Sequence, residues 1–107
     1  MYELGPGEAS TYHWHVGEEE WLIVLAGAPT VRTPDGEREL RAGDIVASPE
    51  GEAGAHTFLN RREASARIAL FSTLNPPTLP VYPDSDKVGA NRRYYRTEDA
   101  VDYWDRE

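Results

Sequence analysis

Turn-forming residues interrupt this chain so often that they limit the length of any regular element. The 107 residues include eight prolines and nine glycines, and these lie between short apolar runs. Short apolar runs bounded by such residues are typical of β-strands joined by tight turns. We therefore expect an all-β protein, and 107 residues provide for one domain with a single core.

The apolar runs predict seven or eight short strands before residue 75. Alternation over residues 9–15 predicts a half-buried strand, and the Trp, Leu, Ile and Val content of residues 20–26 predicts a mostly buried one that ends at Gly27. Pro34-Asp35-Gly36 indicates a hairpin, because Asp-Gly tolerates the positive φ that such turns require. Other strands are expected at residues 28–33, 37–40, 45–48, 55–59 and 66–73. Strands at this spacing favour a closed barrel or a sandwich.

The character of the sequence changes after residue 74. Prolines 76, 77, 80 and 83 predict an extended path with few ladder hydrogen bonds. This tail is also rich in aromatic side chains: Tyr82, Tyr94, Tyr95, Tyr103 and Trp104. So much apolar surface predicts that the tail packs on the barrel or on a partner subunit. Residues 1–74 are thus expected to form the barrel and residues 75–107 an extension, with Thr97 capping a last short helix.

All three histidines of the chain fit one candidate metal site. His13 and His15 share a strand face because side chains alternate with period two, and Glu20 follows five residues later. A barrel points alternate side chains into one cavity, so His56 could join them from a distant strand. The chain has no cysteine, so any metal must be held by nitrogen and oxygen ligands. The alternative is that the three histidines have structural roles or lie on the surface and fit this pattern by chance.

Neighbouring acidic residues compete with Glu20 for the carboxylate position. Three adjacent strand residues cannot all face inward, and we expect Glu18 and Glu19 to lie in a solvated turn, with Glu19 as the reserve ligand. Asp44 and Asn60 are interpreted as turn residues. An apolar cavity lining is expected from Thr11, Leu22, Val24, Phe58, Ile68 and Leu70, which favours a small, partly apolar ligand.

The net charge of −8 disfavours nucleic acid and anionic membrane as partners, since both require a basic face. The sequence has no run of 18 apolar residues that could cross a membrane. Its N-terminus lacks the basic and apolar segments of a secretory signal. A cytoplasmic protein is the resulting expectation.

The spacing of these residues resembles two motifs of the cupin superfamily. The first motif is matched by Gly7, His13, His15, Glu20 and Gly27, and the second by Gly43, Pro49, Gly51, His56 and Asn60. One departure is that four residues separate Gly51 from His56, where two are commonest; this insert, residues 52–55, is small and glycine-bearing and can bulge. The resemblance implies a cupin-type double-stranded β-helix (jelly-roll) barrel, a metal site and a homodimer. Residues 82–89 look like the tail of small bacterial cupins that generally have no assigned reaction.

Three function hypotheses follow. The first is a metal-dependent enzyme, dioxygenase-like or isomerase-like, in which His13, His15, Glu20 and His56 hold Fe, Mn, Ni or Zn and a small organic molecule reacts in the barrel. The alternative is a non-catalytic cupin that binds or senses a metal or small ligand. The third, a metal-free sugar-nucleotide epimerase, would use basic residues for phosphate, and the candidates are Arg61, Arg62 and Arg67. An anion could also bind near Asp84, Ser85 and Lys87, although the sequence favours a polar turn there.

Overall fold

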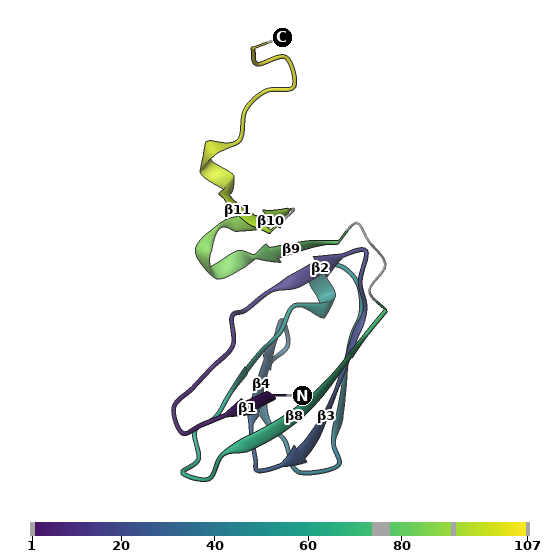
Figure 1. Ribbon diagram of the computed structural model, residues 1–107, viewed down its shortest axis with the longest axis vertical. Coiled ribbons are helices and arrows are strands. Elements are labelled where there is room, and N and C mark those ends of the chain that lie inside the picture. The colour runs from purple at the N-terminus through teal and green to yellow at the C-terminus, as the bar shows by residue number, and fades with distance from the viewer. Residues whose placement is uncertain (1, 74–77, 91, 107) are drawn as a thin grey trace.

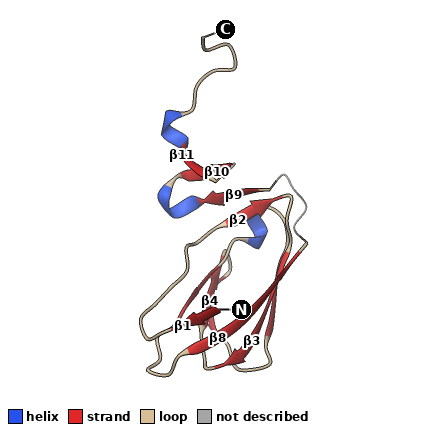
Figure 2. Cartoon of the chain, viewed as in Figure 1, coloured by secondary structure: helices blue, strands red, loops and turns tan. Residues whose placement is uncertain are grey.

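The computed structural model describes residues 2–73, 78–90 and 92–106, and its regular elements are strands and three short 3₁₀ turns (Figures 1 and 2). The barrel strands are β1 (Tyr2–Leu4), β2 (Trp14–Val16), β3 (Glu20–Ala26), β4 (Thr30–Thr33), β5 (Gly36–Glu39), β6 (Ile45–Ser48), β7 (Thr57–Leu59) and β8 (Ala66–Ser72). The all-β fold and the count of eight strands before residue 75 confirm the sequence prediction. None of the helical turns in the described residues has the length and apolar character needed to cross a membrane.

The largest barrel sheet has the strand order β1-β8-β3-β6 and carries most of the core. Along β3, Glu20, Leu22 and Val24 are buried, whereas Trp21 and Leu25 are exposed. This alternation puts every second side chain of β3 into the barrel, as the pleat of a strand requires. The core comprises Leu4, Leu22, Val24, Val31, Leu40, Phe58, Ala66 and Ile68.

A smaller sheet, β5-β4-β7, closes the barrel. The predicted hairpin joins β4 to β5, and its Gly36 has a φ of 117°, a value that L side chains rarely adopt. Asn60 follows β7 and is almost fully buried; its side-chain amide donates to the carbonyls of Leu4 and Ala64. Asn60 therefore fixes the turn after β7, as expected from the sequence.

The segment before β2 differs from the predicted strand over residues 9–15. Ala9 and His13 form isolated bridges, and only residues 14–16 are a regular strand. The segment still runs beside β7, where Ser10 donates its backbone N–H to the carbonyl of Phe58. The prediction of one continuous strand is wrong because the segment meets its partner at separated points rather than along a full ladder.

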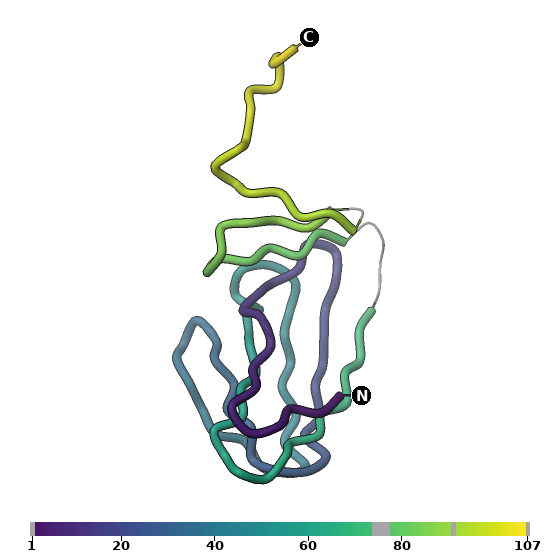
Figure 3. The backbone as a smooth tube through the Cα atoms, turned by 60° about the vertical axis from the view of Figure 1, so that its left-hand side comes forward, coloured from purple at the N-terminus to yellow at the C-terminus, as the bar shows by residue number. Residues whose placement is uncertain are grey.

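Strands of the tail pair with β2 and form a second four-stranded sheet with the order β11-β10-β9-β2. This sheet lies across one end of the barrel (Figure 3). Its strands are β9 (Leu79–Tyr82), β10 (Lys87–Ala90) and β11 (Arg93–Arg96), and the 3₁₀ turn η2 (Pro83–Ser85) joins β9 to β10. The prediction of few ladder hydrogen bonds is therefore wrong for residues 79–82. Pro80 fits within β9 opposite His15, and its ring packs beside Gly89, where a Cβ would come within 2.8 Å of it.

The end of the tail leaves the barrel. The 3₁₀ turn η3 (Thr97–Asp99) replaces the predicted short helix, and Thr97 is its first residue rather than its cap. Residues 100–106 are exposed and extend away from the strands (Figure 1). The predicted boundary between residues 74 and 75, like Pro76 and Pro77, lies outside the described residues.

Candidate metal centre

Three imidazoles surround one carboxylate oxygen at the start of β3. Glu20 is buried, and its Oε1 lies 3.0 Å from His15 Nδ1, 3.5 Å from His56 Nε2 and 3.8 Å from His13 Nε2. All four residues that the sequence singles out therefore meet at one point.

The backbone holds His56 directly beside His13. The two residues form a bridge in which each backbone N–H donates to the other's carbonyl, with N–O distances of 3.1 and 3.0 Å. Their ring centroids are 4.9 Å apart, and the rings of His13 and His15 are 4.8 Å apart. The closed barrel thus brings together residues that are distant in sequence.

Two backbone carbonyls fix which ring nitrogens face Glu20. Nδ1 of His13 lies 2.8 Å from the carbonyl oxygen of Thr11, and Nδ1 of His56 lies 2.8 Å from that of Gly54. A carbonyl oxygen only accepts, so each Nδ1 carries the proton in the neutral ring and Nε2 keeps its lone pair. Both Nε2 atoms are therefore free to bind a metal.

The four-residue insert before His56 supplies one of these carbonyls. Residues of the insert form the 3₁₀ turn η1 (Glu52–Gly54) instead of a simple bulge, and His56 still reaches the cluster. A side chain at Gly54 would overlap the carbonyl oxygen of Pro49. Glycine at this position lets the turn fold tightly enough to present its carbonyl to His56.

A second carboxylate, from Glu18, lies on the other side of His15. Its side chain is only 10 % exposed, its Oε2 is 3.8 Å from His15 Nε2, and its Oε1 accepts a hydrogen bond from the Ser72 hydroxyl. The expected solvated turn is therefore wrong for Glu18, whereas Glu19 is exposed as expected. Strand periodicity gives no signal for this in the sequence, because Glu18 lies in the loop between β2 and β3.

The close contacts change the acidity of these groups. Burial raises the pKa of Glu20, but the close polar contact with His15 and its charge, followed by the charges of His56 and His13, outweigh it, so the pKa lies below its ordinary value. Burial lowers the pKa of His15, but Glu20 and then Glu18 outweigh that effect and leave the pKa raised. Burial is the largest cause of the lowered pKa of His56. His56 therefore favours the neutral form that binds metals.

The donor set fits a divalent metal ion. Oε1 of Glu20 is buried and makes no hydrogen bond of acceptable geometry, although His15 Nδ1 is 3.0 Å away. An unsatisfied buried oxygen is costly, and a cation would satisfy it. Two donors that each lie about 2.1 Å from one ion are separated by up to about 4 Å, and the three imidazole–carboxylate distances fall within that range. Ligand atoms of His13, His15 and Glu20 all lie within 4.8 Å of one another.

The expected apolar cavity lining is instead solid core. Leu22, Val24, Phe58 and Ile68 are at most 2 % exposed and pack together, whereas Leu70 is 40 % exposed. A barrel of this size is filled by its own side chains. The aromatic neighbours of the site are Phe58 against His56 and Tyr82 against His13, each pair with ring centroids 5.8 Å apart.

The arginines proposed for a metal-free epimerase are already paired. Arg61 Nη1 lies 2.6 Å from Glu37 Oε1, and Arg62 donates two hydrogen bonds to the carboxylate of Glu39. Arg67 Nε is 3.5 Å from Glu3. These surface pairs occupy the three arginines, so they give the third hypothesis no free basic cluster at the positions named for it.

Comparison with known families agrees with the fold. Residues 1–72 match the family model described as the cupin domain. The chain belongs to the cupin family. Its barrel is therefore the cupin double-stranded β-helix that the motif spacing implied.

Some solved cupin structures resemble this chain over its tail as well as over its barrel. A cupin-superfamily sugar phosphate isomerase from Silicibacter pomeroyi is 28 % identical with a TM-score of 0.83, and the match covers 96 % of this chain and 69 % of that one. A candidate sugar phosphate isomerase from Acidithiobacillus ferrooxidans is 26 % identical with a TM-score of 0.81, covering 94 % and 67 %. A polyketide cyclase from Streptomyces resistomycificus is 26 % identical with a TM-score of 0.58, covering 71 % and 54 %. No protein of curated function matches the sequence.

Proposed function

We propose that this cupin is a metal-dependent isomerase acting on a small hydroxylated carbonyl compound. One divalent transition metal, Fe, Mn, Ni or Zn, would be held by His13, His15, Glu20 and His56. The observation that carries the proposal is the buried, unsatisfied Oε1 of Glu20 with three imidazole nitrogens 3.0 to 3.8 Å away.

The chain itself provides a group for proton transfer. When bound, the ion would supply Lewis acidity toward a carbonyl or hydroxyl oxygen. Glu18 lies beside His15, and its carboxylate is held by the Ser72 hydroxyl. In the proposed isomerisation Glu18 accepts a proton from the carbon next to the carbonyl and returns it to the former carbonyl carbon, while a hydroxyl proton passes between the two oxygens. The atoms and electrons balance without a co-reactant.

Two observations support an isomerase over an oxygenase. Two matched structures that each cover at least 94 % of this chain, tail included, are proteins described as sugar phosphate isomerases. The second carboxylate also provides the acid–base group that a proton shift requires. A non-catalytic cupin would need the metal cluster but no carboxylate at the position of Glu18.

The test is an aldose–ketose isomerisation assay on the full chain, combined with metal analysis. The glutamine variant of Glu18 should keep its metal content and lose activity by about a hundredfold or more, because general acid–base catalysis is removed. The matched control, Glu19→Gln, removes an exposed neighbouring charge and should change neither.

Chelation should abolish the activity and added metal should restore it. Activity that survives chelation, or that survives His56→Ala, would contradict the proposal. A metal-loaded protein that binds sugars without turning any of them over would instead support the non-catalytic binding protein.

A further inference from the structure

The tail sheet carries a row of polar side chains on one face. Lys87 of β10 lies directly opposite Tyr82 of β9 and Arg96 of β11, and directly opposite residues share a face. Tyr94 precedes Arg96 by two residues, so it lies on that face as well. We refer to Tyr82, Lys87, Tyr94 and Arg96 as the tyrosine–cation face.

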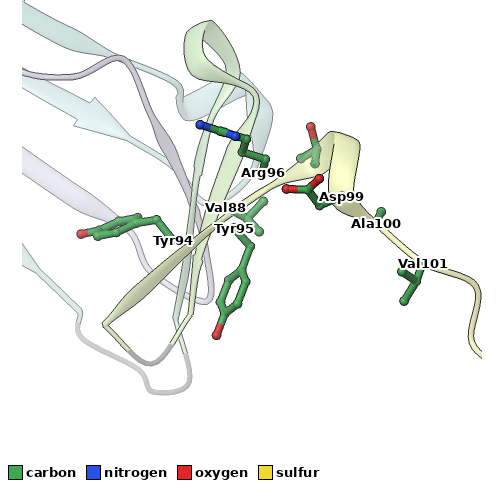
Figure 4. A pocket seen from close by; sticks show the side chains of 8 residues that line it. Val88, Tyr94, Tyr95, Arg96, Asp99, Ala100 and Val101 are labelled. Atoms are coloured by element: carbon green, nitrogen blue, oxygen red, sulfur yellow. The ribbon is translucent and has the colours of Figure 1, made fainter. Parts of the chain in front are cut away.

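This face is turned toward the candidate metal centre. The ring of Tyr82 lies 5.8 Å from the ring of His13 and 5.8 Å from that of Tyr94. The ammonium of Lys87 lies 5.1 Å from the Tyr82 ring centroid and 5.5 Å from that of Tyr94. Figure 4 shows the side chains of Tyr94 and Arg96 on the barrel side of β11, whereas Tyr95 points another way.

The two cations of the face have no acidic partner within the part of the chain that the structure describes. Most arginines of the barrel are paired, and Arg32 is an example, since it contacts Asp84 at 2.6 Å. Neither Lys87 nor Arg96 forms an ion pair, although Asp99 borders the same hollow of about 650 Å³ as Arg96 (Figure 4). Like charges directly opposite on neighbouring strands repel each other, so a shared anion would stabilise this arrangement.

The chemistry of the four side chains suits a phosphate group. Arginine offers a planar fork that matches two phosphate oxygens, and lysine binds phosphate as a compact positive charge. The phenols of Tyr82 and Tyr94 hydrogen-bond to each other, and the pair still offers a hydroxyl donor to a ligand. The sequence favours a polar turn at Asp84, Ser85 and Lys87, and the turn η2 covers the first two of them. Asp84 pairs with Arg32, whereas Lys87 lies over the two tyrosines.

We propose that the tyrosine–cation face binds the phosphate of a sugar monophosphate whose carbonyl end lies at the metal centre. The position of the carbonyl end rests on the proposed function, whereas phosphate binding requires only the face itself. The His13 ring lies 5.8 Å from the Tyr82 ring, and the Tyr82 ring lies 5.1 Å from the Lys87 ammonium. A monosaccharide phosphate can bridge the sum of these two distances. The face therefore selects a phosphorylated substrate over the free sugar.

The test is calorimetric titration of the full chain with inorganic phosphate, glucose 6-phosphate and glucose. Both phosphates should bind, and glucose should bind at least about tenfold more weakly than its phosphate. Lys87→Gln and Arg96→Gln should each weaken phosphate binding about tenfold or more, because each removes a charge-assisted contact. Lys87→Arg, which keeps the charge, should retain most of the binding.

The matched control is Arg93→Gln, which removes the same charge from the same strand on its other face. It should change phosphate affinity less than about twofold, and metal content should stay the same in all variants. Equal weakening by Arg93→Gln and Arg96→Gln, or equal affinity for glucose and glucose 6-phosphate, would overturn the inference.

The two proposals can fail separately. Phosphate binding that depends on Lys87 and Arg96 in a protein without metal or turnover would support the inference and reject the proposed isomerase. Metal-dependent turnover, combined with phosphate binding that Lys87→Gln and Arg96→Gln leave unchanged, would support the proposed isomerase and reject the inference about the tyrosine–cation face.

Discussion

Glu20 combines burial with contact to all three histidines, so it is the residue on which the candidate metal centre depends most. Glu20→Gln keeps the shape of the side chain and removes its charge. We expect metal affinity to fall by about a hundredfold or more, since an anionic ligand becomes a neutral one. Competition with a chelator of known affinity measures the change, and an affinity within twofold of the parent protein would contradict the assignment.

Gly54 links backbone packing to the orientation of His56. A Cβ at this position would overlap the carbonyl oxygen of Pro49, and the Gly54 carbonyl itself accepts from His56 Nδ1. Gly54→Ala should therefore lower the free energy of unfolding by about 1–3 kcal/mol and weaken metal binding. Urea unfolding and metal titration check both effects, with Glu52→Ala in the same turn as the control. A Gly54→Ala variant as stable as the parent protein would contradict this prediction, because it would show that the turn can relax around the added Cβ.

Acidification should release the metal. Free imidazoles protonate near pH ~6.5, and protons compete with metal for the same nitrogens. In the metal-free protein the pKa of His15 is raised, so this residue becomes charged at a higher pH than an ordinary histidine, whereas the lowered pKa of Glu20 keeps that carboxylate charged. We expect affinity to fall by at least about a hundredfold between pH 7 and pH 5. Metal affinity that does not change over this range would exclude the histidines as ligands.

Among the structural elements, η2 and β4 are joined by an ion pair that ties the tail to the barrel. Arg32 donates two hydrogen bonds to Asp84 and also lies 4.0 Å from the Tyr12 ring centroid. Asp84→Asn should therefore increase amide hydrogen exchange over residues 79–90 by about two- to fivefold, a small effect because the pair is exposed. Glu39→Gln breaks the exposed pair with Arg62, which does not involve Arg32, and should leave that exchange unchanged.

The same ion pair has a defined pH dependence. Arg32 holds the pKa of Asp84 below its ordinary value, so the stabilising effect is present above that ordinary value and is lost as the pH falls through the lowered one. Exchange in the tail should thus rise selectively in acid in the parent protein but not in the Asp84→Asn variant. An identical acid response in both proteins would show that another group holds the tail.

Local patterns predicted the barrel elements well because their signals lie within a few residues. β3 and β6 have the predicted limits, and the Pro34-Asp35-Gly36 hairpin forms where expected. The continuous strand over residues 9–15 was not confirmed, and the pairing of β9 with β2 was missed. Both depend on which distant segment lies alongside, and single residues do not specify that.

The candidate site likewise contains residues that the sequence predicted and residues that it missed. Motif spacing predicted that His13, His15, Glu20 and His56 would meet, and their nitrogen and oxygen atoms do converge. Glu18 was missed because its place in a charged run suggested solvent. The tyrosine–cation face was missed because it exists only through the register of β9, β10 and β11.

The whole molecule is elongated by its tail, with extents of 54 × 26 × 25 Å. Its radius of gyration of 15.5 Å exceeds the ~13 Å expected for a compact domain of this length. Tyr103 and Trp104 at the end of the tail are 83 % and 72 % exposed. We propose that a second copy of the chain covers them in a homodimer, since large aromatic side chains rarely remain in solvent.

Light scattering on the purified chain checks this proposal. The mass should be twice that of the chain, and Tyr103→Ser combined with Trp104→Ser should shift it toward the monomer. A monomeric parent protein at all concentrations would contradict the proposal.

The central claim is that His13, His15, Glu20 and His56 together hold one metal ion. Its most direct test is elemental analysis of the full chain, purified without chelators, together with anomalous X-ray scattering from its crystals. We expect one first-row transition metal per chain, with an anomalous peak about 2.0–2.2 Å from ligand atoms of these four residues. A peak elsewhere, or a chain that stays metal-free after incubation with Fe, Mn, Ni and Zn salts, would contradict it.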